Sequence, residues 1–188
     1  MLNLIRNFKR RGNMKKNAVK NLTLGAIIAA LYTALTLMVA PFSFGPVQLR
    51  LSEALTVLPA ICPPATVGLT LGCLISNLLG FALGANPLGV IDALVGTAAT
   101  FLAAVTTAYI GKKFKGKALY FLAPLPPVIF NAVFVGLELC IVVLGDTSLP
   151  TLIATCAYVG IGEAIACYLG GGALLKGSYK YFNDMFKD

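Results

Sequence analysis

The stretch Gln48–Gly68 reads QLRLSEALTVLPAICPPATVG and places Arg50, Glu53 and the pair Pro63-Pro64 inside an otherwise apolar region. Two successive prolines remove backbone donors and clash with the preceding helical turn, so a helix is expected to stop there. We therefore predict a helical hairpin with its bend at Cys62–Ala65. This bend decides how often the chain crosses a membrane.

The composition identifies the class of protein. Of the 188 residues, 58% are hydrophobic and only 12% are charged, whereas a soluble domain carries about 25% charged residues. Mean hydropathy is +0.85. The chain is therefore predicted to be an integral membrane protein, with room for about six spans of roughly 20 residues.

Four apolar runs are expected to form single spans, and one region is longer. The single spans are Leu22–Ala40, Leu88–Gly111, Ala118–Gly145 and Leu149–Leu175. The longer region, Leu51–Gly84, contains the double proline. As an α-helix its first arm, about Val47–Ile61, reaches only about 22 Å, which predicts a short or tilted helix shielded by its neighbours.

The basic residues set the topology. All 15 except Arg50 lie in an N-terminal tail, in the loop GKKFKGK that begins at Gly111, and in a C-terminal tail. Such clusters mark cytoplasmic flanks of membrane spans, so an even number of crossings must precede Lys112 and Leu51–Gly84 must cross twice. The prediction is an all-α bundle of six transmembrane helices with a short second helix. Its basic cytoplasmic tail covers 1–21, its membrane domain 22–175 and its cytoplasmic C-terminal tail 176–188.

Polar side chains at membrane depth are costly and normally face a cavity or a partner. With this topology, seven of them are expected to line one acidic pocket open to the outside, suited to a cationic ligand or one rich in N–H donors. These residues are Arg50, Glu53, Asn77, Asp92, Asn131, Glu138 and Glu163.

Structural roles remain open for some of these residues. Arg50 and Glu53 are able to form an ion pair at a helix start, Asp92 to cap a helix, and Asn131 to bond between helices. Glu138 and Glu163 have apolar neighbours and no lysine within a helical turn, which favours a role facing the ligand.

A strip of small residues runs along the first span. Ala26, Ala30 and Ala34 recur every fourth residue, and Gly25 with Ala29 repeats the spacing beside them. Such strips allow close helix packing, either within the bundle or against a separate membrane subunit.

Enzymatic chemistry has little support in the sequence. There is no His, the commonest acid–base side chain and metal ligand, and neither an HExxH nor a GxSxG motif occurs. The five Cys form no CxxC pair and are expected to be buried apolar residues. No cofactor or metal is therefore predicted.

Three longer motifs carry a family resemblance: QLRLSEALTVLP (48–59), GLTLGCLISNLLG (68–80) and NPLGVIDALVGTAATFLAA (86–104). On these, the chain resembles the substrate-binding (S) components of energy-coupling-factor (ECF) vitamin importers over about Leu22–Leu175. Among them it is similar to the QueT branch, proposed to import queuosine precursors. The resemblance implies a multi-pass protein of the bacterial plasma membrane that captures its ligand from outside.

The same resemblance implies partners and ligand chemistry. A transmembrane coupling subunit, docked on the strip Ala26, Ala30 and Ala34, and two cytoplasmic ATPases would drive transport, which agrees with the absence of a GxxxxGK[ST] motif here. For a 7-deazaguanine ligand, one carboxylate would accept from the guanine edge and another would pair with an aminomethyl cation. Asn77 and Asn131 would read carbonyl or ring nitrogens.

Two further elements complete this interpretation. Arg50 would gate the pocket or orient Glu53, and the loop Pro41–Gln48 is the candidate lid. The alternatives are an S component for another vitamin, a stand-alone channel or secondary carrier, an intramembrane enzyme, and a structural scaffold. No clear internal repeat occurs, which disfavours an inverted-repeat carrier.

Overall fold

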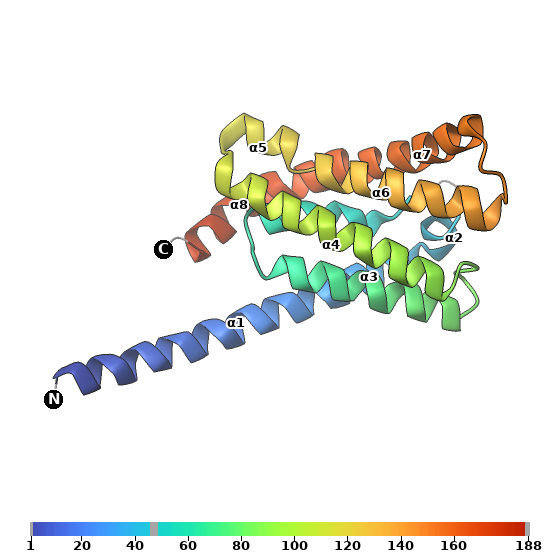
Figure 1. The fold of residues 1–188 in the computed structure, drawn as a ribbon. Coiled ribbons are helices and arrows are strands. Elements are labelled where there is room, and N and C mark those ends of the chain that lie inside the picture. The colour runs from blue at the N-terminus through green and yellow to red at the C-terminus, as the bar shows by residue number, and fades with distance from the viewer. Residues whose placement is uncertain (1, 46–48, 187–188) are drawn as a thin grey trace.

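The computed structural model describes residues 2–45 and 49–186, with side chains described from residue 17 onward. Within these ranges every element is helical and no strand occurs (Figure 1). In chain order the elements are α1 (Leu2–Met38), α2 (Ala40–Ser43), η1 (Leu51–Ala60), α3 (Ala65–Ala82), α4 (Val90–Lys113), α5 (Gly116–Leu122), α6 (Leu125–Glu138), η2 (Leu139–Val143), α7 (Leu149–Ala164), η3 (Ile165–Gly171) and α8 (Gly172–Met185). Here η1 is a 3₁₀ helix, and η2 and η3 are π-helical.

Among the described residues, five helical stretches are long and apolar enough to cross a bilayer. Their outward faces carry large apolar side chains, among them Val67, Leu94 and Ile153. So much exposed apolar surface is foreign to soluble monomers and suits contact with lipid. The stretches are Asn17–Met38, Ala65–Ala82, Val90–Lys113, Gly116–Val143 and Leu149–Met185. The prediction of a helical membrane bundle is confirmed at this level.

The predicted hairpin around the double proline is present. The short helix η1 ends at Ala60 and α3 begins at Ala65, so the turn occupies residues 61–64. Most of η1 is buried, as expected for a short helix shielded by its neighbours. It is a 3₁₀ helix, whose rise of about 2.0 Å per residue lets ten residues reach about 20 Å instead of about 15 Å.

Both predicted tails are helical where the structure describes them. Residues 2–21 of the predicted N-terminal tail form the first part of α1, and the predicted tail after Leu175 continues as α8 to Met185. Lys and Arg are good helix formers, so a change to basic composition does not end a helix. Lys20 joins the middle of α1 to the end of α8, because its Nζ donates to the carbonyl of Met185 at 2.9 Å and lies 4.5 Å from the Phe186 ring centre.

Close packing of α1 on α3 distinguishes the two small-residue strips of α1. A Cβ built on Gly68 would lie 2.5 Å from the carbonyl oxygen of Gly25, and one on Gly72 would lie 3.1 Å from Cα of Ala29. The strip of Gly25 and Ala29 is therefore internal. The neighbouring strip, made of Ala26, Ala30 and Ala34, is exposed.

Gly111 fixes the end of η1 against α4. A Cβ at this position would lie 2.0 Å from the carbonyl oxygen of Ala60 and 2.4 Å from its Cα. Backbone cannot yield as a flexible side chain does, so Gly111→Ala is expected to lower the free energy of unfolding by about 1–3 kcal/mol. Thermal unfolding in detergent measures this.

Gly172→Ala is the matched control for this substitution. Gly172 is helical, with φ −62°, and a Cβ there would meet nothing within 4 Å. Alanine at this position is expected to be neutral or stabilising by up to about 1 kcal/mol. Equal stability of the two variants would contradict the proposed contact between η1 and α4.

Candidate ligand-binding site

The seven predicted site residues are all buried in the bundle interior, and none points into lipid. Arg50 and Glu53 come from the start of η1, Asn77 from α3, Asp92 from α4, Asn131 and Glu138 from α6, and Glu163 from α7. They divide into a closed ion-pair cluster and a set of carboxylates with open hydrogen-bonding capacity.

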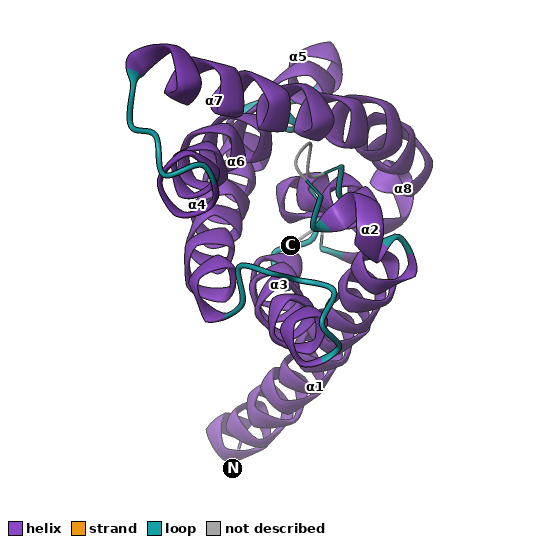
Figure 2. Cartoon of the chain, turned by 90° about the vertical axis from the view of Figure 1, so that its right-hand side faces the viewer, coloured by secondary structure: helices purple, strands orange, loops and turns teal. Residues whose placement is uncertain are grey.

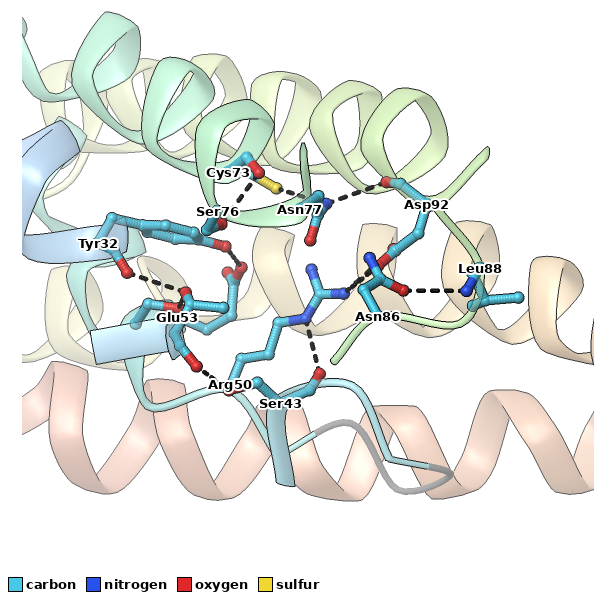
Figure 3. Close-up of polar contacts among 12 residues, drawn as sticks. Tyr32, Ser43, Arg50, Glu53, Cys73, Ser76, Asn77, Asn86, Leu88 and Asp92 are labelled. Carbon is cyan, nitrogen blue, oxygen red and sulfur yellow. Dashed lines mark hydrogen bonds and ion pairs between the residues drawn. The ribbon is translucent and has the colours of Figure 1, made fainter. Parts of the chain in front are cut away.

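The ion-pair cluster is centred on Arg50 and Asp92. Nη2 of Arg50 donates to both carboxylate oxygens of Asp92, at 3.1 and 2.9 Å, and Nε donates to the carbonyl of Ser43 at 3.1 Å (Figure 3). Asn86 donates to Oδ2 of Asp92 at 2.8 Å, and Asn77 donates to the Asp92 carbonyl at 3.0 Å. The cluster thus joins α2, η1, α3 and the start of α4.

This geometry corrects two interpretations of the sequence. Arg50 forms its ion pair with Asp92 and not with Glu53, because the Glu53 carboxylate is turned toward the Tyr32 hydroxyl (Figure 3). Asp92 does not cap α4, since Gly89 occupies the N-cap position and no side chain bonds there. The Asp92 carboxylate instead accepts hydrogen bonds from Arg50 and Asn86.

A second cluster surrounds Glu53. The Tyr32 hydroxyl donates to Oε1 of Glu53, whereas Oε2 is buried without a hydrogen-bond partner of ordinary geometry. The Asn131 side chain faces the carboxylates of both Glu53 and Glu163. The Cys167 thiol lies 3.8 Å from Oε2 of Glu163, a weak contact, so both carboxylates retain capacity to accept hydrogen bonds.

Glu138 is the least satisfied acid of the site. Its side chain is 4% exposed, and neither carboxylate oxygen has a hydrogen-bond partner within the described structure. The charges acting on it are those of Asp92 and Arg50, which already neutralise each other. A buried carboxylate in this state is costly, which indicates a position kept for a ligand.

The helix geometry changes beside both Glu138 and Glu163. Glu138 is the last residue of α6, and the π-helical η2 starts at Leu139; Glu163 lies two residues before the π-helical η3. Such segments occur frequently at functional sites. Here they widen the turn directly after each acid, which alters the direction of side chains relative to a regular α-helix.

A cavity of about 580 Å³ opens at one end of the bundle. This end carries α2 and the start of α7, and it faces the viewer in Figure 2. Its wall includes Phe44, Leu88, Leu139 and Tyr158. The Phe44 ring centre lies 5.5 Å from Cζ of Arg50, and Leu139 follows Glu138 in the chain. None of the seven predicted site residues belongs to its lining, so this cavity is an apolar vestibule next to Arg50 and Glu138 and not the acidic pocket expected from the sequence. Of the candidate lid, residues 46–48 lie outside the described residues.

Comparison with known proteins shows the family. Residues 22–180 match the family described as QueT transporter. The chain belongs to this family. A relative from Lactococcus lactis subsp. cremoris (strain MG1363), named "Queuosine precursor transporter QueT", is 39% identical over 70 residues, covering 36% of this chain and 41% of the relative. No solved structure matches the chain.

Membership of the QueT transporter family confirms the resemblance seen in the sequence motifs, and it identifies a transporter and not an enzyme. Within the described part of the chain, no group of three or more His, Cys, Asp or Glu side chains lies close enough together to hold a metal ion.

Three residues of this candidate site were not identified from the sequence. Tyr32 resembles any aromatic residue of a span, yet its hydroxyl bonds Glu53. Asn86 holds Asp92, although a loop asparagine after glycine and alanine reads as a turn residue. Gly96 has no motif, but a Cβ there would lie 3.1 Å from Nδ2 of Asn77. These roles become visible only in the three-dimensional arrangement of residues on neighbouring helices.

Proposed function

We propose that this chain is the S component of an ECF-type importer that captures a queuosine precursor of the 7-deazaguanine type from outside the cell. The buried carboxylates with unpaired oxygens, above all Glu138, are the observation that carries the proposal. Family membership and the name of the Lactococcus lactis relative support the choice of ligand.

The open acids suit the hydrogen-bond donors of such a ligand. A carboxylate accepts two N–H bonds at once from a guanine-like edge, and a second carboxylate pairs with an aminomethyl cation. We assign the first role to Glu163 with Asn131 and Glu53, and the second to Glu138. Oδ1 of Asn77 is also buried and unpaired, so it is available as a further acceptor.

Arg50 and Asp92 take a different role in this proposal. Their contacts occupy the Asp92 carboxylate together with Nε and Nη2 of Arg50. They instead hold α2, η1 and α4 at fixed positions around the ligand. The acids left to bind the ligand are then Glu53, Glu138 and Glu163.

The proposed topology has six crossings, with η1 as the short second one and both termini cytoplasmic. The two chain ends lie at the same end of the bundle in Figure 1, as does the lysine loop after α4. The exposed strip Ala26, Ala30 and Ala34 is then available to dock on the transmembrane coupling subunit, which two ATPases drive. This face is free because Gly25 and Ala29 make the internal contact.

Mass spectrometry of small molecules that co-purify with the full chain tests the ligand. A 7-deazaguanine, displaced by added 7-aminomethyl-7-deazaguanine and not by riboflavin, thiamine or biotin, is the expected result. A different vitamin would favour an S component of another specificity. Uptake of the precursor without any ATPase partner would contradict the importer proposal in favour of a stand-alone carrier.

A further inference from the structure

A second hollow lies at the opposite end of the bundle from the vestibule. It measures about 360 Å³ and sits where the end of η1, the start of α3, the end of α4 and α8 meet. Its wall is made of both apolar and polar residues. Its lining includes Pro59, Pro63, Lys112, Lys115, Asn183 and Phe186.

The polar part of this lining is basic. Lys115 donates to the carbonyl of Gly111, another residue of the lining, at 2.7 Å, which fixes the position of its ammonium group. Lys112 makes no hydrogen bond or ion pair within the described residues. Lys20 approaches from the other side, 4.5 Å from the ring centre of Phe186. Two lysines therefore belong to the lining itself and a third lies beside it.

The surroundings of the hollow add to its positive potential. Lys113, Lys117, Lys176 and Lys180 lie at the same end of the chain's helices, and Asp184 is the acid found there among the described residues. Basic pockets between transmembrane helices at a membrane surface attract the phosphate of anionic lipids. The apolar wall beside the lysines matches the glycerol and upper acyl region of such a lipid.

We propose that this hollow is a binding site for the phosphate headgroup of an anionic phospholipid, held by Lys112 and Lys115. The lipid comes from the leaflet that this end of the bundle faces. Bound there, it bridges the end of η1 to α4 and α8. This site is separate from the acidic cluster and does not depend on the identity of the transported ligand.

Native mass spectrometry of the detergent-purified full chain, titrated with phosphatidylglycerol or phosphatidylcholine, tests this proposal. Phosphatidylglycerol is expected to bind in preference. The double variant Lys112→Gln/Lys115→Gln is expected to weaken its binding at least about tenfold. The matched control, Lys113→Gln/Lys117→Gln, removes the same charge from the same loop outside the lining and is expected to change binding less than about threefold.

Three results would overturn the proposal. Equal losses in the two double variants would assign lipid binding to diffuse charge and not to this hollow. Equal binding of phosphatidylcholine would remove the requirement for an anionic headgroup. Displacement of phosphatidylglycerol by millimolar inorganic phosphate would identify a site for free phosphate instead of lipid. An unchanged elution profile on size-exclusion chromatography shows that the variants are folded.

Discussion

Replacing Asp92 with alanine is expected to lower the free energy of unfolding by about 3–5 kcal/mol. The reason is the partner that remains: Arg50 is 3% exposed and would keep a buried charge without a counterion. Arginine stays protonated in proteins, so it cannot escape by becoming neutral. Asn86 would also lose its acceptor, Oδ2 of Asp92. Denaturation of the detergent-purified protein measures the loss.

The double variant Arg50→Met/Asp92→Leu distinguishes the cost of leaving one buried charge unpaired from the cost of having no ion pair at all. Replacing both members of a buried ion pair by apolar residues is often neutral or stabilising, so most of the lost stability is expected to return. A double variant as unstable as Asp92→Ala would show that the pair has another essential role. Parent-like stability of Asp92→Ala would show that the ion pair contributes nothing.

The sequence predicts the parts of this fold that follow from local chemistry. Pro63-Pro64 stops a helix wherever it occurs, so the turn between η1 and α3 could be placed correctly. Charges within apolar spans avoid lipid, so the burial of Glu138 and Glu163 could be predicted. The 3₁₀ geometry of η1 could not, because it depends on how far that segment must reach between its neighbours.

The partner of Arg50 illustrates what local reasoning misses. Glu53 lies three residues away in the sequence, whereas Asp92 lies on another helix. The choice depends on which side chains of α1 and α4 lie beside η1, because Tyr32 of α1 engages Glu53 and Asp92 of α4 engages Arg50. The sequence therefore identifies the charged residues of the site but not how they pair.

The assignment of Ala26, Ala30 and Ala34 stayed open for a related reason. Two interleaved small-residue strips run along α1, and either one permits close packing. Gly68 and Gly72 on α3 decide which is internal, because they approach Gly25 and Ala29. The periodicity of one helix cannot reveal a choice made by its neighbour.

Glu138→Gln and Glu163→Gln are each expected to weaken ligand binding by about 10- to 100-fold, as isothermal titration with the co-purified ligand measures. A hydrogen bond to a charged group contributes about 1.5–3 kcal/mol, and glutamine replaces one acceptor oxygen by a donor that opposes the ligand's N–H groups. In the absence of ligand, neither variant is expected to lose stability. At Glu138 the substitution removes a buried charge that has no partner, so the free protein should be at least as stable.

Asp146→Asn is the matched control for both substitutions. Asp146 is an exposed acid of the loop before α7, where it accepts hydrogen bonds from Thr151 and Ser148. These bonds lower the pKa of Asp146, so its carboxylate is charged at neutral pH and the control also removes a negative charge. The affinity of Asp146→Asn for the ligand should change less than about twofold, because solvent screens an exposed charge.

Unchanged affinity in both Glu138→Gln and Glu163→Gln would remove the ligand role of these acids. An equal loss in Asp146→Asn would assign the effect to long-range charge instead of contact.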